Sequence, residues 1–186
     1  YMHDQGGSWL PSEVGNNDNW VAMIVNGTGV GQYRIITGRT SEGTHRVRLN
    51  LASSWRLAPD ETSRICVFAA QRQNIITGNT AVGSNPEKDR TIFVLLWNDA
   101  LDNIVSGNVV SGVSAGVIVS GMLQGPSSWN LVEHNEFRDM GGFMNALNQS
   151  KNTFYSNTFN ITVEASEGFA IPETHLIELQ RMVNLS

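Results

Sequence analysis

Several side chains that could transfer protons lie close together between residues 133 and 139. Glu133 and His134 are adjacent, and Glu136 and Asp139 follow within a few positions. A carboxylate beside an imidazole suits general acid–base catalysis, in which one group accepts a proton and another donates one. A solvated polar face would contain the same residue types, so both interpretations stay open from these residues alone.

A second group combines tryptophans with carboxylates. Asp99 and Asp102 lie in the segment that follows Trp97, and Trp129 lies beside a later turn. An indole can stack on the apolar face of a sugar ring while its N–H donates a hydrogen bond, and two carboxylates ~5–9.5 Å apart can support glycoside hydrolysis. Turn formation by Asp and covering of a corner by Trp are the alternatives. We predict that these four residues bind the substrate.

A repeat in the sequence indicates which elements position these residues. Each copy consists of Asn, two mostly apolar residues, two further residues that are mostly small or polar, and a second Asn. Successive copies begin 22 to 29 residues apart. Because Asn and Gly favour tight turns, this pattern is typical of short strands separated by corners. The copies are Asn74–Asn79, Asn103–Asn108, Asn130–Asn135 and Asn152–Asn157.

The repeat predicts a coil, because a rung of three short strands cannot bury its apolar face without neighbours. Stacking at the ~4.8 Å strand spacing places like residues over like residues. The second Asn of each copy would turn a corner, and its amide would hydrogen-bond along the coil. The predicted inward residues are Ile76, Val105, Val132 and Phe154 on one wall and Ala81, Val110, Phe137 and Phe159 on the next.

The predicted fold is therefore an all-β, right-handed, single-stranded parallel β-helix, a solenoid of about six rungs. Residues 1–186 form a single β-helix domain, and the abrupt start predicts that it is part of a longer chain. An earlier copy at residues 32–39 predicts an insertion or long turn at residues 40–63, within an early rung. A sandwich and a leucine-rich solenoid fit less well, because hairpin signals are sparse and Leu is not the repeated residue.

The same register connects the coil with the first candidate group. Glu133 falls in a column of outward positions with Thr77, Ser106 and Tyr155, since alternate residues of a strand face opposite sides. Tyr155 would then lie one rung, ~5 Å, from Glu133. We predict Glu133, His134 and Tyr155 as catalytic residues: Glu133 or His134 accepts a proton and Tyr155 donates one.

Composition narrows the classes of function. Charged residues make up 16% of the chain and the formal net charge is −5, which argues against a nucleic-acid partner. There is no polybasic segment for an anionic membrane and no apolar run long enough for membrane insertion. Cys66 is the single cysteine, so an intrachain disulfide and a multi-cysteine metal site are excluded. We predict no metal and no cofactor.

The Asn-based repeat resembles that of the pectin-lyase-like superfamily of right-handed parallel β-helix proteins, over roughly residues 20–171. That superfamily includes polysaccharide lyases, glycoside hydrolases, sugar epimerases, tailspikes and adhesins, so the resemblance implies a carbohydrate partner, often outside the cell. The Asn-Thr-Asp and Gly-His-Gly motifs of polygalacturonases and the Asp-Pro-His motif of mannuronan epimerases are absent. A fold shared by so many activities does not by itself define one.

We therefore predict an extracellular or cell-surface domain that binds polysaccharide, with cleavage of lyase or glycoside hydrolase type left open. The alternative is a structural or adhesive β-helix without catalysis, such as a fibre, tailspike or surface-layer segment. The ends of a coil expose unpaired strand edges. These uncapped ends predict self-association or a partner chain.

Overall fold

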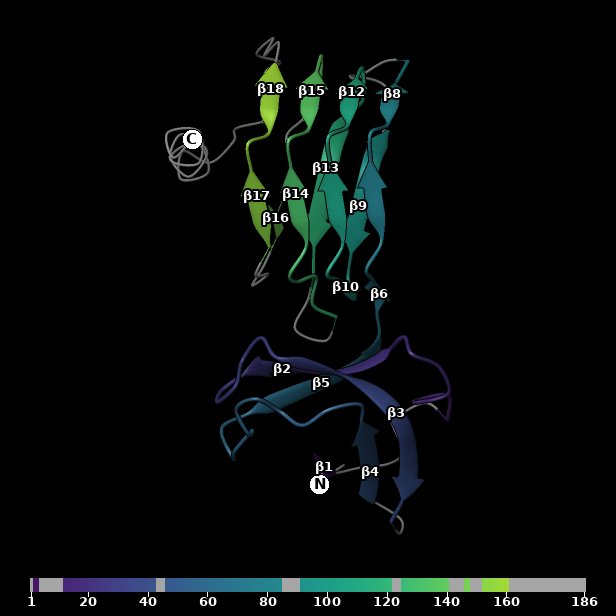
Figure 1. Cartoon of the computed structure of the whole chain (residues 1–186), viewed down its shortest axis with the longest axis vertical. Coiled ribbons are helices and arrows are strands. Elements are labelled where there is room, and N and C mark those ends of the chain that lie inside the picture. Colours follow the sequence, from purple (N-terminus) through teal and green to yellow (C-terminus); the bar gives the residue numbers. More distant parts are fainter. Residues whose placement is uncertain are drawn as a thin grey trace, which may run out of the picture.

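The computed structural model describes residues 2–3, 12–42, 46–84, 91–121, 125–140, 146–147 and 152–160. These residues form β-strands and turns without a helix, and thus contain no helix that could cross a membrane. Figure 1 shows a parallel coil of short strands that lies beside an antiparallel sheet formed by the N-terminal strands. The predicted all-β class is confirmed.

Three walls of parallel strands build the coil, in the orders β17-β14-β11-β7, β18-β15-β12-β8 and β16-β13-β9. The predicted parallel β-helix is therefore confirmed, with four rungs in the described residues. The first wall contains β7 (Ile75–Thr77), β11 (Ile104–Ser106), β14 (Leu131–Glu133) and β17 (Thr153–Tyr155). The second contains β8 (Thr80–Val82), β12 (Val109–Ser111), β15 (Glu136–Arg138) and β18 (Thr158–Asn160). The third contains β9 (Ile92–Trp97), β13 (Ala115–Ser120) and β16 (Ala146–Leu147).

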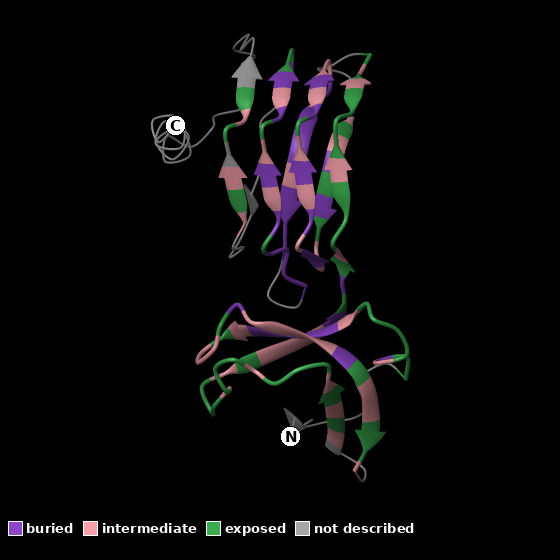
Figure 2. Ribbon diagram, in the orientation of Figure 1, coloured by how far each residue is buried: buried purple, intermediate pink, exposed green. Residues whose placement is uncertain are grey.

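Where the side chains of the coil are described, the inward positions are those that the repeat predicts. Val105 pairs with Ile76 in the rung before it and with Val132 in the rung after it. The second wall repeats this arrangement around Val110. Val105, Val132 and Val110 are fully buried, and Figure 2 shows buried positions side by side on neighbouring strands of both walls. Stacked apolar side chains thus form the core of the coil.

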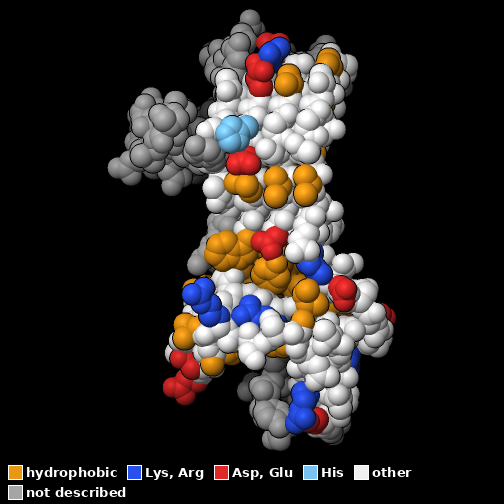
Figure 3. Space-filling view, viewed as in Figure 1, with side chains coloured by type: hydrophobic (Ala, Val, Ile, Leu, Met, Phe, Trp, Pro, Cys, Tyr) orange, Lys and Arg blue, Asp and Glu red, His pale blue; other side chains and the backbone are white. Residues whose placement is uncertain are grey.

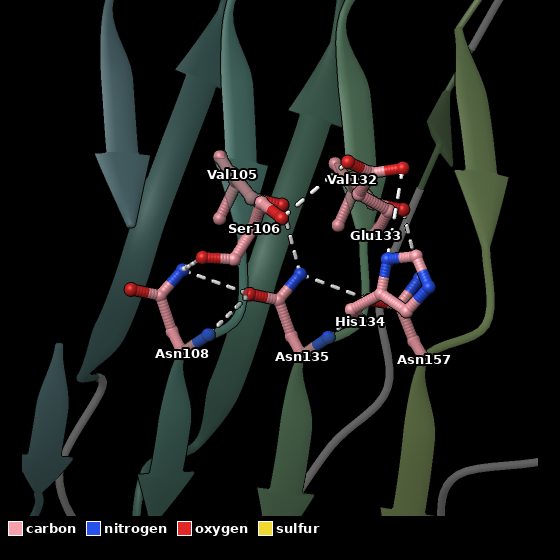
Figure 4. Close-up of polar contacts among 8 residues, drawn as sticks. All are labelled: Val105, Ser106, Asn108, Val132, Glu133, His134, Asn135 and Asn157. Carbon is pink, nitrogen blue, oxygen red and sulfur yellow. Dashed lines mark hydrogen bonds and ion pairs between the residues drawn. The ribbon is translucent and has the colours of Figure 1, made fainter. Parts of the chain in front are cut away.

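Two ladders of asparagines run along the coil, of which the one through the second Asn of each copy was predicted. Asn108 accepts hydrogen bonds from the backbone N–H and the side-chain amide of Asn79, and donates to Asn135 in the same manner. Asn135 donates onward to Asn157, and its amide also donates to the carbonyl of Val105 at 2.9 Å (Figure 4). The second ladder joins Asn74, Asn103, Asn130 and Asn152.

Each corner places a residue with left-handed backbone just before a ladder asparagine. Gly78 and Gly107 take this position with φ of 66° and 62°, and His134 takes it in the next rung with φ of 51°. Glycine adopts this conformation without strain, whereas other residues adopt it less readily. At the other corner, the equivalent residues are Gln73, Asp102 and Trp129, with φ of 58°, 53° and 62°.

The N-terminal part differs from the predicted early rung. It forms a five-stranded antiparallel sheet in the order β1-β4-β3-β2-β5, so neither residues 32–39 nor residues 40–63 belong to a coil rung. This difference removes the earliest of the six predicted rungs. The strands are β1 (Met2–His3), β2 (Trp20–Asn26), β3 (Tyr33–Ser41), β4 (Arg46–Leu51) and β5 (Arg64–Ala69).

A glycine-rich turn explains the antiparallel pairing. Gly27, Gly29 and Gly31 lie between β2 and β3 with φ of 77°, 81° and 91°, a conformation that favours glycine. The N–H of Gly31 donates to the carbonyl of Ile24 at 2.8 Å. The chain therefore reverses tightly and β2 pairs with β3 as a hairpin, whereas a coil rung would continue to a parallel strand.

The coil and the sheet share an apolar contact. The short strand β6 (Gln71–Arg72) follows β5 and pairs in parallel with β10 (Ala100–Leu101). Leu101 is fully buried and packs in a cluster with residues of the sheet. One corner of the coil is thereby held against the sheet. The cluster contains Val21, Met23, Phe68, Ala70 and Leu101.

Candidate functional site

A shallow depression of about 450 Å³ lies where this corner of the coil meets the sheet. Figure 3 shows hydrophobic side chains together with an acidic side chain at this junction. Two of the four residues predicted to bind substrate, Asp102 and Trp129, line the depression. The sheet and its following loop contribute the remaining lining residues, which are Gly31, Gln32, Tyr33, Arg34, Ile35, Ala52 and Ser53.

The corner geometry explains why Asp102 and Trp129 lie together. Each immediately precedes a ladder asparagine and adopts the left-handed conformation of that corner. A parallel bridge between Leu101 and Ser128 holds the two corner segments in adjacent rungs. Residues separated by 27 positions in the sequence therefore become neighbours at about one strand spacing, ~4.8 Å.

Two hydrogen bonds connect these corner residues with the sheet. The hydroxyl of Tyr33 donates to Oδ2 of Asp102. The indole Nε1–H of Trp129 donates to the carbonyl of Gly31 at 2.8 Å, and 42% of Trp129 remains exposed. Because its N–H is bound to the sheet, the indole is held in place.

Arg34 also lines the depression. Its Nη1 donates to the carbonyl of Tyr33 at 2.6 Å, and its Nε donates to the carbonyl of Ser54 at 2.7 Å. The guanidinium lies 5.3 Å from the centroid of the Trp55 ring, within the range of a cation–π contact. These contacts fix the loop after β4 beside the depression.

The environment of Tyr33 makes its titration a test of this arrangement. Burial, then the hydrogen bond to Asp102 and the charge of Asp102, raise the pKa of Tyr33 from 10.0 to about 12. Neutral Tyr33 therefore favours the folded state fully below pH 10, and this contribution is lost as the pH rises towards 12. In an ultraviolet titration we expect a tyrosinate component that ionises well after an ordinary tyrosine.

The controls follow from the same causes. Tyr33→Phe should remove the late component. Asp102→Asn should move it back towards pH 10 only in part, because the charge is lost while burial remains. Ionisation of all three tyrosines of the chain together near pH 10 would contradict the proposed contact between the sheet and the coil.

The other two predicted substrate-binding residues do not line this depression. Trp97 ends β9 and is 50% exposed. Asp99 has a partly buried carboxyl whose Oδ1 has no hydrogen-bond partner among the described residues, and burial raises its pKa. Trp97 and Asp99 therefore belong to the same turn region as Asp102, but outside the depression.

Glu133 and His134 of the predicted catalytic group lie on the outer face of the first wall, and the side chain of Tyr155 lies outside the described residues. Glu133 pairs in register with Ser106 in the rung before it and with Tyr155 in the rung after it, as the column predicts. Nδ1 of His134 is 3.7 Å from Oε2 of Glu133, and Ser106 Oγ is 3.4 Å from Oε1. Figure 4 shows Glu133 and His134 together on this face. Neither residue lines the depression, and their catalytic role stays a prediction.

Tyr33 and Arg34 were missed by the sequence analysis. Both lie in the segment that was interpreted as an early rung of the coil, where Tyr33 would have been one of its strand residues. The available signal was the glycine-rich turn at residues 27–31, which indicates a hairpin and hence an antiparallel sheet. Asp102 and Trp129 could be found because Asp102 is one of two carboxylates in a predicted turn and Trp129 lies near a predicted corner.

Fold and site together define a parallel β-helix with an antiparallel sheet against one corner. A family model described as "Periplasmic copper-binding protein (NosD)" matches residues 34–169, and this chain belongs to that family. The family is part of the right-handed parallel β-helix, pectin-lyase-like superfamily, which confirms the resemblance at that level. No curated protein and no solved structure matches the chain.

The name of the family raises the question of copper. Among the described residues, no three His, Cys, Asp or Glu side chains gather as a metal site would require. Cys66 is partly buried, and burial raises the pKa of its thiol to about 11, which disfavours the thiolate that binds metals. Met23 and Met140 are buried in two different apolar clusters. The described part of the chain therefore does not fit a copper site.

Proposed function

We propose that this chain is a carbohydrate-binding β-helix domain and that the depression beside Trp129 is its binding site. The observation that carries the proposal is a partly exposed indole, held by its N–H, beside a carboxylate and a phenol. A sugar ring offers an apolar face for stacking and hydroxyl groups for hydrogen bonding, and this combination of side chains complements both.

The polar groups of the depression have distinct roles in this proposal. The carboxylate of Asp102 has acceptor capacity beyond the bond from Tyr33, because an ionised carboxylate offers about four lone-pair sites. It would accept hydrogen bonds from sugar hydroxyls. Arg34 and Tyr33 are held by the protein's own hydrogen bonds, so little side-chain conformational entropy would be lost on binding.

The family description, which names a periplasmic protein, supports a location outside the cytoplasmic membrane. We propose that the sugar is encountered there or at the cell surface. A structural or adhesive β-helix, the alternative function, would not require a depression that contains a tryptophan held by its N–H. The Asp102, Tyr33 and Trp129 arrangement therefore favours binding over a purely structural role.

The test is a binding measurement with a panel of acidic and neutral polysaccharides. Trp129→Ala should weaken binding about tenfold, since loss of one stacking contact costs about 1.4 kcal/mol. Asp102→Asn, which keeps an acceptor for Tyr33, should weaken binding without loss of folding. Trp97→Ala is the matched control, because Trp97 is also an exposed tryptophan but lies outside the depression.

Cleavage is measured on the same panel with the wild type and Glu133→Gln. If Glu133 and His134 act as an acid–base pair, the substitution should lower the rate of cleavage by ~10²–10⁴-fold while binding is unchanged. Binding without cleavage would define a binding domain. If Trp129→Ala binds and cleaves like the wild type, the proposed site is wrong. If the wild type neither binds nor cleaves any polysaccharide of the panel, the structural alternative is favoured.

A further inference from the structure

The depression beside Trp129 lies at one end of the outer face of the first wall. Alternate residues of a strand point to the same side, and Leu131 and Glu133 are the outward residues of β14, on either side of the fully buried Val132. Trp129 stands two positions before Leu131. At ~3.3 Å per residue, the four positions from Trp129 to Glu133 span about 13 Å. The depression and the predicted catalytic group therefore lie at the two ends of one short segment.

Two rows of side chains cross the face between these ends. The row next to the corner is apolar, since Leu131 pairs with Ile104, and Ile104 pairs with Ile75. Ile75 is 66% exposed, and the other two are partly exposed. Figure 3 shows a row of hydrophobic side chains on the same face as the junction of coil and sheet. The face thus offers apolar contact beside the corner and polar groups beyond it. The polar row consists of Thr77, Ser106 and Glu133.

Hydrogen-bond acceptors are present at both ends of this face. The carboxylate of Asp102 accepts from Tyr33 through Oδ2 and has further lone pairs. At the other end, Oε1 of Glu133 lies 3.4 Å from Oγ of Ser106, and Oε2 lies 3.7 Å from Nδ1 of His134. The side chains of Glu133 and His134 are 27% and 58% exposed, so a ligand on this face can reach both. A ligand with hydroxyl groups along its whole length would find acceptors at each end.

The charges on this face favour a neutral ligand. Asp102 and Glu133 are carboxylates, and none of the outward residues of β7, β11 and β14 is basic. Arg34 is the one basic residue among the described residues that line the depression, and its Nε and Nη1 already donate to backbone carbonyls. An acidic polysaccharide would place its own carboxylates beside those of the protein, and such contacts between like charges disfavour binding.

We propose that one neutral polysaccharide chain binds along β11 and β14, from the depression across the apolar row to Glu133 and His134. This inference rests on the proposed sugar binding beside Trp129 and extends it to a chain of several sugar units. One unit would stack on the indole, and the following units would cover Ile104 and Leu131 with their apolar faces. A unit at the far end would donate hydrogen bonds from its hydroxyl groups to Glu133. A single sugar ring in the depression is too short to reach Glu133, whereas an extended oligosaccharide reaches it.

The first experiment measures affinity against ligand length, with glucose, mannose and xylose and with their β-1,4-linked hexasaccharides. The hexasaccharide of the best-bound sugar should bind about tenfold more tightly than its monosaccharide, because the longer chain adds the contacts with Ile104 and Leu131. Ile104→Ser should weaken hexasaccharide binding about fivefold and leave monosaccharide binding unchanged, since each methylene group that a ligand covers contributes roughly fourfold to affinity. Val109→Ser is the matched control and should bind like the wild type, because Val109 is an outward, partly exposed residue of the same rung on the second wall.

The second experiment locates the same ligands by proton NMR, with the indole N–H signal of Trp129 and the imidazole signals of His134 assigned from Trp129→Ala and His134→Gln. The monosaccharide should shift only the indole signal, and the hexasaccharide should shift both. A hexasaccharide that shifts the indole signal alone would overturn the inference and leave the binding site in the depression intact. Tighter binding of hexagalacturonate, an acidic chain of the same length, than of every neutral hexasaccharide would have the same consequence. If no ligand shifts the indole signal, the proposed function is wrong as well.

Discussion

Replacing Val105 by aspartate is expected to lower the free energy of unfolding by about 4 kcal/mol, because an uncompensated carboxylate would be placed in the apolar core. Val105 is completely buried between Ile76 and Val132, and it belongs to the main core cluster of the coil. The prediction is checked by denaturant unfolding followed by circular dichroism. A loss of this size is a large part of the stability of an ordinary domain.

The matched control is Ile75→Asp, which makes a similar apolar-to-carboxylate change on the outward side of the same wall. Ile75 is 66% exposed, so its carboxylate stays in water and the cost should be about 1 kcal/mol or less. Equal effects of the two substitutions would contradict the alternation of inward and outward residues. Because the alternation places Glu133 outward, the same comparison also tests the position of the predicted catalytic group.

The coil could be predicted because its residues obey a strict local rule. In each rung an Asn follows a left-handed corner residue, and the residue two positions after that Asn points inward, so stacking repeats the same pairings. Val105 and Val110 could be assigned to the core from this spacing alone, and the structure confirms both. A repeat predicts inward positions because every copy has to bury its apolar side chains against the same residues of the neighbouring copies.

The N-terminal sheet could not be predicted in this way, because similarity in sequence does not fix the partner of a strand. Ile35 and Ile36 match Ile75 and Ile76 in type and spacing, yet Ile35 pairs antiparallel with Val21 across a hairpin. The antiparallel pairing results from Gly27, Gly29 and Gly31, whose left-handed backbone conformation reverses the chain. Apolar periodicity predicts a strand, but turn geometry decides its neighbour.

The candidate site was half predictable for the same reason. Asp102 and Trp129 belong to the repeat, and their corner positions bring them into adjacent rungs. Tyr33 reaches Asp102 only because the sheet packs against Leu101 of the coil. The N-terminal sheet does not follow the repeat of the coil. A contact between the sheet and the coil therefore produces no periodic pattern in the sequence. The depression therefore emerges from the tertiary packing and not from the repeat.

The asparagine ladder is the second feature on which the coil depends, and Asn135→Ala is expected to lower the free energy of unfolding by about 3 kcal/mol. The substitution removes the acceptor for the N–H and the amide of Asn108, at 3.1 and 2.8 Å. It also removes the donor to the carbonyl of Val105. Asn108 is completely buried, so water cannot replace the lost acceptor, and each unsatisfied buried group costs about 1–3 kcal/mol.

Asn79→Ala is the matched control from the start of the same ladder. Asn79 is exposed, so water can solvate the groups that its removal leaves open, and the expected loss is about 1 kcal/mol or less. Asn135→Asp adds a second comparison, because it keeps the shape, an acceptor and the backbone N–H bond to Asn157, but its ionised side chain cannot donate to Val105 or Asn157. Denaturant unfolding should place Asn135→Asp with Asn135→Ala and well below Asn79→Ala. If Asn135→Asp matched the wild type, the shape of the corner would stabilise the coil and the directed hydrogen bonds of the ladder would not.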